Sequence, residues 1–277
     1  MALGGNPVFA NNKNFSNRSN AGVGAAGSTS APPLYTAEQL QNMYNSPAAG
    51  PAQTGRMTYD DVIVKTVCTL ALVLVGAVAG WFMPALALPG ALIGLALGLV
   101  NSFKREPSPA LILLYAVAEG VFLGGISGIL EQRFGGIVIQ AVLGSLSVFA
   151  VTLVLFRSGK IRVTPKFTRF FIIAISGYLL FSLVNLGLSM FGVVNQPFGI
   201  RSMDIPGTHI PFGFALGLLA VGLAAFSLIL DFDSIQRGVQ NGVPARYSWT
   251  AAFGLTVTLV WLYVEILRML AILRGND

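Results

Sequence analysis

Cysteine, histidine and charged side chains are all scarce in this chain. Its 277 residues include 1 Cys and 1 His, and Lys, Arg, Asp and Glu make up 10% of them, against roughly 25% in soluble domains. The lone cysteine, Cys68, excludes an intramolecular disulfide, and the lack of a His or Cys cluster excludes an ordinary transition-metal site. We therefore expect no metal site and no resident cofactor, with Ca²⁺ as a transient ligand at most.

Apolar side chains take the place of the missing charges. They form 54% of the chain, and the mean hydropathy is +0.72, which indicates a membrane protein. Lys and Arg (17) outnumber Asp and Glu (11), but they fall mostly between the apolar segments, so their placement indicates membrane topology and not nucleic-acid binding. The expected partner is the lipid bilayer, with other membrane proteins left open.

Residues 1–58 differ in composition from the rest of the chain, being rich in Asn, Gly, Ala, Ser and Pro. They include too few large apolar side chains to bury a core, so we predict a disordered polar arm followed by a transmembrane domain over residues 59–277. Because the arm shows no signal-peptide run of about 7–15 apolar residues, the first apolar segment is expected to direct insertion. Within the arm, LYTAEQLQNMY is compatible with a short amphipathic helix.

The transmembrane domain contains seven apolar segments, each long enough to cross a bilayer as a helix. None shows the strict alternation of a membrane β-barrel strand. The sequence therefore predicts an all-α membrane protein, a seven-transmembrane-helix bundle. The segments are Val62–Met83, Ala85–Phe103, Pro109–Leu130, Ile137–Phe156, Phe170–Val194, Phe212–Ile235 and Trp249–Leu273.

Basic residues concentrate in alternate connections between these segments. The opposite connections offer only Arg133 and Arg201. By the positive-inside rule, we predict a plasma (bacterial inner) membrane protein with a cytoplasmic N-terminus and an outer C-terminus. The basic residues of the cytoplasmic connections are Lys104, Arg105, Arg157, Lys160, Arg162, Lys166, Arg169, Arg237 and Arg246.

Glycines recur every four residues on several segments, which clears one helix face for close packing in lipid. The pattern is clearest on the third segment, where three glycines align. The glycines concerned are Gly76 and Gly80; Gly90, Gly94 and Gly98; Gly120, Gly124 and Gly128; and Gly213 and Gly217.

Three acids lie within the apolar segments, where an ionisable group is costly and usually functional. Asp231 and Glu265 lie on the last two segments, and Glu119 lies about 15 Å into the third, near the bilayer centre. Glu119 could alternatively be a protonated acid that donates a hydrogen bond to a backbone carbonyl. Glu265 could alternatively be a structural ion-pair partner of Arg268. With the helices as drawn, Asp231 and Glu265 are not level.

Other polar residues complete this set. Asp233 lies roughly 200° around the helix from Asp231, and we predict that it forms a surface ion pair with Arg237. Ser227 and Ser234 share the Asp231 face and are predicted to extend a polar track. On the fifth segment Asn185 follows Ser182 and precedes Ser189 at helical spacing, a pattern typical of bonds between helices.

Two of these segments carry a family resemblance. LILDFDSIQRG resembles the sixth-helix motif of the Bax inhibitor-1/YccA-like (transmembrane Bax inhibitor motif) membrane proteins, and WLYVEILRML resembles their seventh-helix motif. YAVAEGVFLGGIS resembles their third-helix segment more weakly, and MTYDDVIVKT after a long polar arm resembles a bacterial branch. The resemblance covers about residues 57 to 274.

The resemblance implies a pH-sensitive calcium leak gated by two acids, here at Asp231 and Glu265. Glu265 departs from the family's Asp, and the interval between the two positions is longer than in the family, which leaves Glu119 as an alternative partner for either acid. Carboxylates that share a low-dielectric site exchange protons as one unit, and their ionisation can create an oxygen site for a hard cation.

The sequence also bears on non-transporting and enzymatic functions. A regulatory or scaffolding membrane protein that acts through other membrane proteins remains the alternative function. GISG matches the motif of an intramembrane serine protease, with Ser127 as nucleophile, but that chemistry needs a facing histidine, and His209 falls in a connection. We therefore expect no enzymatic activity.

Overall fold

The structure is a computed structural model that describes residues 36, 38, 41, 55–159, 161, 163–194, 198–207 and 211–275. The chain divides into two units, Met1–Ala48 and Ala49–Asp277, and all the helices discussed below belong to the second. Most of the predicted N-terminal arm lies outside the described residues, as does His209, and of the segment LYTAEQLQNMY only residues 36, 38 and 41 are described.

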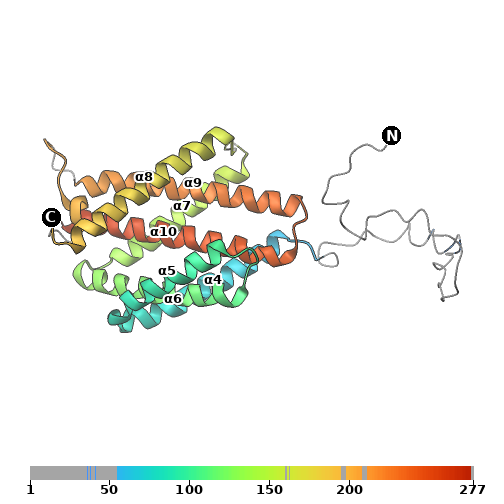
Figure 1. Ribbon diagram of the computed structural model, residues 1–277, viewed down its shortest axis with the longest axis horizontal. Helices are drawn as coiled ribbons and strands as arrows, with labels where there is room; N and C mark the ends of the chain where they lie inside the picture. The colour runs from blue at the N-terminus through green and yellow to red at the C-terminus, as the bar shows by residue number, and fades with distance from the viewer. Residues whose placement is uncertain are drawn as a thin grey trace, which may run out of the picture. The chain divides into compact units, whose positions relative to one another are not determined.

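Seven helices in the described part of the chain are long and apolar enough to cross a membrane (Figure 1). Each matches one predicted segment, which confirms the all-α, seven-helix prediction. Among the described residues, extended backbone pairing is limited to isolated bridges. The helices are α4 (Tyr59–Phe82), α5 (Ala87–Phe103), α6 (Pro109–Arg133), α7 (Ile137–Arg157), α8 (Pro165–Met190), α9 (Phe212–Gln240) and α10 (Ser248–Gly275).

Capping residues determine where two of these helices begin. The Thr58 hydroxyl caps α4 by accepting a hydrogen bond from a backbone N–H of its first turn. Thr164 caps α8 by accepting from Phe167 N at 3.2 Å, and Pro165 takes the first helical position, which needs no N–H donor. These two residues start α8 before the predicted Phe170, so the basic residues in between belong to the helix and not to the connection.

Glycines allow α4 and α6 to pack with their backbones in contact. A Cβ added at Gly120 would collide with the backbone of Val73, and one added at Gly124 would collide with the backbone of Ala77. No side-chain rotation can relieve such collisions. The close packing predicted for the third helix is therefore confirmed, and α4 is the helix against which it packs.

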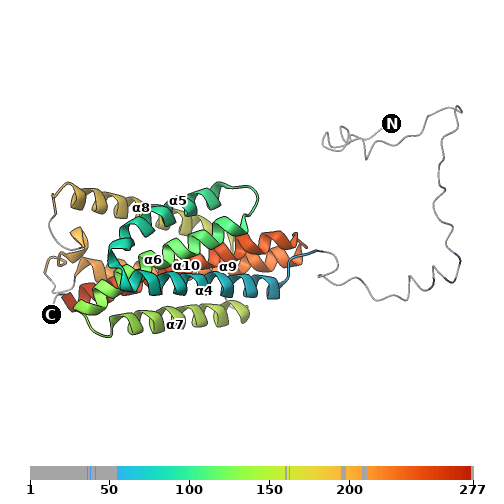
Figure 2. The same cartoon turned by 90° about the horizontal axis from the view of Figure 1, so that it is seen from below.

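The last helix, α10, runs through the middle of the bundle. Figure 2 shows it in the middle of the bundle, with α5 and α8 on one side and α4 and α7 on the other. It contacts α4, α6, α7 and α9, and 56% of its most apolar stretch is buried, a larger share than in any other described span. Side chains presented by α10 therefore face neighbouring helices on most sides.

The backbone just before α4 is tied to the connection between α9 and α10. Met57 N donates to Val243 O at 2.7 Å, and Ala245 N donates to Gly55 O at 2.8 Å. Met57 is also buried. The ordered bundle thus begins before residue 59, the boundary that composition indicates.

Further contacts show which connections lie at the same end of the bundle. Arg246, between α9 and α10, pairs with Glu106, between α5 and α6, at 3.3 Å. Arg274, near the end of α10, donates instead to Gly135 O, between α6 and α7, at 2.8 Å. The start of α4 and the end of α10 therefore lie at opposite ends, as seven crossings require.

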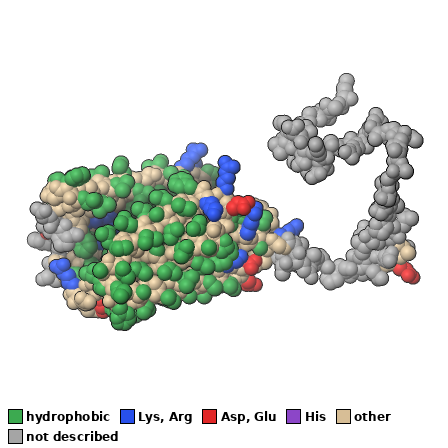
Figure 3. Space-filling model, turned by 60° about the horizontal axis from the view of Figure 1, so that its bottom comes forward, with side chains coloured by type: hydrophobic (Ala, Val, Ile, Leu, Met, Phe, Trp, Pro, Cys, Tyr) green, Lys and Arg blue, Asp and Glu red, His purple; other side chains and the backbone are tan. Residues whose placement is uncertain are grey.

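Apolar side chains cover the sides of the bundle. On the face shown in Figure 3 they extend over most of its length, and charged side chains gather toward the ends, mainly at one of them. Exposed leucines such as Leu74 and Leu180 contribute to this surface. Such a surface suits contact with the hydrocarbon of a bilayer.

Candidate functional site

Glu265 lies in a buried polar cluster near the end of α10, where 2% of its surface is exposed. Its carboxylate accepts hydrogen bonds from the Tyr178 hydroxyl, the Arg268 guanidinium and, at 3.2 Å, the Trp261 indole N–H. Arg201 Nη1 is 3.8 Å from Glu265 Oε2 and completes the cluster. The predicted pair between Glu265 and Arg268 is confirmed.

Arg201 is the member of this cluster that the sequence did not reveal. It lies in the connection between α8 and α9, where we predicted it, but only 3% of it is exposed. It belongs to a short 3-10 helix, η2 (Gly199–Ser202), that folds inward between α8 and α9. Its guanidinium donates to Ser182 Oγ at 2.8 Å and to the Tyr178 hydroxyl at 3.2 Å.

The polar stripe on α8 holds this connection in place. Asn185 Oδ1 accepts from Ile200 N at 2.8 Å, and Asn185 Nδ2 donates to Phe198 O at 3.2 Å. Gly199 has φ +64 and lies directly against Asn185, so this position favours glycine. We predicted that the stripe joins helices, but in the structure Ser182 and Asn185 bind η2.

The charges of the buried cluster do not cancel. Two guanidinium groups, from Arg201 and Arg268, surround one carboxylate. Because Glu265 is paired and hydrogen-bonded on several sides, its contacts are those of a structural ion pair, whose loss would leave a buried charge uncompensated.

Asp231 has a different environment, about two turns of α10 away from Glu265. Its Oδ2 accepts a hydrogen bond from Thr258 Oγ1 at 2.7 Å, and Thr258 is 3.3 Å from Ser227 Oγ. Ser234 instead donates to Leu230 O of its own helix. Among the described residues, no Lys or Arg forms an ion pair with Asp231, so its charge has no internal partner.

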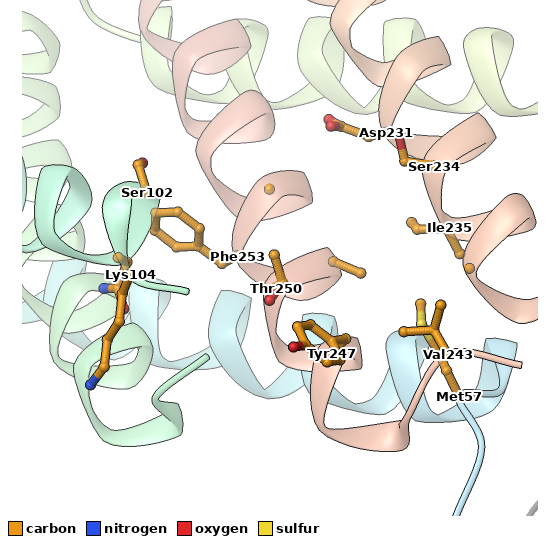
Figure 4. A pocket seen from close by; sticks show the side chains of 14 residues that line it. Met57, Ser102, Lys104, Asp231, Ser234, Ile235, Val243, Tyr247, Thr250 and Phe253 are labelled. Atoms are coloured by element: carbon orange, nitrogen blue, oxygen red, sulfur yellow. The ribbon is translucent and has the colours of Figure 1, made fainter. Parts of the chain in front are cut away.

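A cavity of ≈ 540 Å³ opens beside Asp231, and we call it the Asp231 cavity. Figure 4 shows Asp231 pointing from α9 toward α10, and Phe253 reaching from α10 toward Ser102 at the end of α5. Lys104 lies at its edge. The polar side chains in its lining are Asn101, Ser102, Lys104, Asp231, Ser234, Tyr247 and Thr250.

Asp233 lies outside this cavity, as its helical position predicts. It forms an ion pair with Arg237 one turn later, which confirms the predicted pairing. The Arg237 side chain is 61% exposed, so this pair belongs to the surface.

Glu119 borders a second cavity, of ≈ 370 Å³, between α5, α6 and α10, and we call it the Glu119 cavity. Within the described part of the chain, Glu119 makes no hydrogen bond and no ion pair, so the bond to a backbone carbonyl considered above is not observed. The Glu119 carboxylate occupies space that is free because residue 94 of α5 is a glycine without a side chain. Ser102 and Phe253 line both cavities, which therefore lie next to each other.

The structure does not bring Asp231 and Glu265 together. Thr258, the partner of Asp231, precedes Glu265 by two turns of α10, about 10 Å along its axis. The acid nearer to the Asp231 cavity is Glu119, behind Phe253. No sequence motif signalled this arrangement, because it depends on how α5 and α6 pack against α10.

Ser127, the nucleophile of the protease alternative, is buried and lies 2.7 Å from the Tyr263 hydroxyl. Its neighbour across the helix interface is therefore a phenol, which is not the base that such a reaction needs.

Comparison with known proteins identifies the family. A comparison with curated proteins finds no match. The sequence profile described as Bax inhibitor 1 like matches residues 6–275, nearly the whole chain. With its seven apolar helices, this multi-pass membrane protein therefore belongs to the Bax inhibitor 1-like family.

Proposed function

We propose that this protein is a pH-sensitive cation leak channel or transporter of the plasma (bacterial inner) membrane, with Ca²⁺ as the ion and Asp231 as the pH-responsive group. In this proposal it acts without enzymatic chemistry and without a resident cofactor. The observation that carries the proposal is an unpaired carboxylate at membrane depth, facing a cavity.

The lining of the Asp231 cavity supports a hard cation as the ligand. Calcium binds oxygen atoms, commonly six to eight of them including water. Besides the Asp231 carboxylate, Ser234, Thr250 and Tyr247 bring hydroxyl groups to the lining, and water can supply the remaining ligands. Lys104 lies at the edge of the cavity, but no described Lys or Arg forms an ion pair with Asp231, so the charge of Asp231 is available to a cation.

The Glu265 cluster represents the closed state in this proposal. It lies two turns further along α10 and carries a net positive charge, which repels cations from that end of the bundle. Conduction then requires Arg201 and its carboxylate partner to move. Glu265 thus acts by holding Arg201 and Arg268, and it does not share a proton with Asp231.

The direction of the pH response follows from the charge on Asp231. At acidic pH the carboxyl group is protonated and neutral, so it does not attract a cation. At higher pH it ionises, and the cavity gains a negative charge. We therefore expect the Ca²⁺ flux to rise as the pH increases from about 5 to about 8.

Flux measurement in liposomes tests this prediction. Purified full-length protein is reconstituted, and Ca²⁺ entry is recorded at each pH for the wild type, Asp231→Asn and Asp233→Asn. Asp231→Asn should flatten the pH dependence, because it removes the ionising group. Asp233→Asn is the matched control: its pair is exposed and worth only about 0.3 to 0.5 kcal/mol, so the wild-type profile should persist.

Three results would contradict the proposal. An unchanged pH profile in Asp231→Asn would place the sensor elsewhere. An equal loss in Asp233→Asn would show that the wrong acid of the pair was chosen. No flux at any pH from folded wild-type protein would replace the channel by the regulatory or scaffolding function.

A further inference from the structure

We infer that the Glu119 cavity is a binding site for a lipophilic organic cation, with Glu119 as the counter-ion and the rings of Tyr115 and Phe253 as aromatic walls. This site adjoins the Asp231 cavity of the calcium pathway proposed above, but its counter-ion and its ligand are different. It rests on four properties of the cavity: its charge, its aromatic residues, its few oxygen atoms and its access from the bilayer.

The first property is an uncompensated charge. Glu119 has no Lys, Arg or His partner among the described residues, although it lies about 15 Å into a membrane-spanning helix. A carboxylate at that depth is stabilised by a proton or by a cation that enters from outside the protein. Gly94 gives its carboxylate room, because any side chain at that position would press on Glu119 Oε2.

The second property is the pair of aromatic rings beside the acid. Tyr115 lies one turn before Glu119, on the same face of α6. Phe253 of α10 packs against it edge to face, with 5.1 Å between the ring centroids and an interplanar angle of 74°. Aromatic faces next to a carboxylate are the usual surroundings of quaternary ammonium and similar cations, which gain free energy from the ring quadrupole.

The third property is a shortage of oxygen ligands, which distinguishes this cavity from the Asp231 cavity. Its side-chain oxygens come from Glu119, Tyr115 and Ser102 only. These are too few to replace the hydration shell of Ca²⁺. The rest of the lining is apolar or glycine, namely Ala91, Gly94, Leu95, Gly98, Leu99, Phe122, Phe253 and Val257.

The fourth property is size and access. A volume of ≈ 370 Å³ falls in the range of about 300–1,000 Å³ found for small-molecule sites. Leu95, Leu99 and Val257 line the cavity and are also exposed on the surface of the bundle. The cavity therefore adjoins the hydrocarbon region, from which an amphiphilic ligand can enter.

Tetraphenylphosphonium is a suitable probe, because tetraphenylborate has nearly the same size and shape and the opposite charge. Equilibrium binding of both ions is measured on the full-length protein in nanodiscs of zwitterionic lipid, with empty nanodiscs as the background. We expect saturable binding of the phosphonium only. Glu119→Gln should weaken it tenfold or more, because a desolvated charge loses its partner, and Phe253→Leu should weaken it roughly threefold to tenfold.

Acid provides a second measurement that needs no variant. Glu119 and Tyr115 are the titratable side chains in this lining, and α5 and α10 contribute none to it. Protonation of Glu119 removes the counter-ion, so phosphonium binding should weaken from about pH 8 to about pH 5. Asp233→Asn, whose carboxylate faces neither cavity, should bind like the wild type.

Equal affinity for the phosphonium and the borate would overturn the inference, as would wild-type affinity in Glu119→Gln. Should Glu119→Gln fail to fold, binding by the wild type that does not weaken in acid would overturn it as well. The readout is binding, so its outcome does not depend on whether the protein conducts Ca²⁺.

Discussion

Glu265 touches two guanidinium groups, whereas Asp231 and Glu119 touch none within the described residues. The three acids are nevertheless alike in sequence context, since each interrupts an apolar helix. Replacing each acid by its neutral amide should therefore affect stability differently. Removal of an unpaired carboxylate removes the cost of burying its charge. Removal of a paired carboxylate leaves the charge of its partners buried and uncompensated.

We predict that Glu265→Gln lowers the free energy of unfolding by about 3–5 kcal/mol, because Arg201 would remain buried without a carboxylate. Thermal unfolding in detergent measures the loss. Glu119→Gln is the matched control and should unfold close to the wild-type temperature.

A second variant tests the cause of that loss. Adding Arg201→Met to Glu265→Gln should recover part of the stability, since the uncompensated charge is then gone. Glu265→Gln that unfolds at the same temperature as Glu119→Gln would show that the cluster is not a structural ion pair.

The residue-scale contacts that could be predicted are those between neighbours on one helix. Asp233 with Arg237 and Glu265 with Arg268 follow from spacing alone, because residues three or four apart share a face. Arg201 could not be predicted in this way. It reaches Glu265 from a connection, and nothing in the sequence around it states that η2 folds inward.

At the scale of elements, the contact between α4 and α6 is the least adaptable one in the bundle. The glycines at this interface meet backbone and not side chains, so an added methyl group cannot be accommodated by a rotamer change. Some other glycines face open space: no atom lies within 4 Å of a Cβ added at Gly177 of α8.

This contrast gives a paired prediction. Gly124→Ala should destabilise the protein by about 1–3 kcal/mol or more, as overpacking does. Gly177→Ala should leave stability unchanged or raise it by up to about 1 kcal/mol, because alanine is the better helix former. Unfolding of both variants in detergent provides the comparison, and equal effects would refute backbone contact between α4 and α6.

The element boundaries show where sequence reasoning was sufficient. The start of α6 was predicted at Pro109, the edge of an apolar segment, and the structure places it there, with proline at the first helical position. The start of α8 was predicted too late, since the basic residues after Thr164 were assigned to the connection. Both the cap and the proline that begin α8 were present in the sequence.

For the whole molecule, the number of membrane spans could be predicted from the apolar segments, but the position of each helix within the bundle could not. The most apolar stretches of the α5 and α10 spans have the same mean hydropathy, 1.8. Nevertheless, 11% of the stretch in α5 is buried, against 56% of the stretch in α10. In a bilayer, lipid and protein interior are both apolar, so hydrophobicity does not distinguish a central helix from a peripheral one. The two cavities depend on this central position, and they were accordingly beyond prediction.

Orientation is the remaining prediction at this scale. The basic connections and the N-terminal arm are expected in the cytoplasm, and seven crossings then place the C-terminus outside. A reporter active only in the cytoplasm, fused before residue 1, should be active, and the same reporter after residue 277 should be silent. Activity at both positions would contradict seven complete crossings.

The central position of α10 also constrains the order of assembly during synthesis. α10 leaves the ribosome after α4–α9, yet it contacts four of these helices, α4, α6, α7 and α9. Until it is inserted, η2 is held by Ser182 and Asn185 of α8, and Arg201 has no carboxylate to meet. The six earlier helices therefore form an incomplete bundle, and insertion of the last helix fills its centre and gives Arg201 its carboxylate partner.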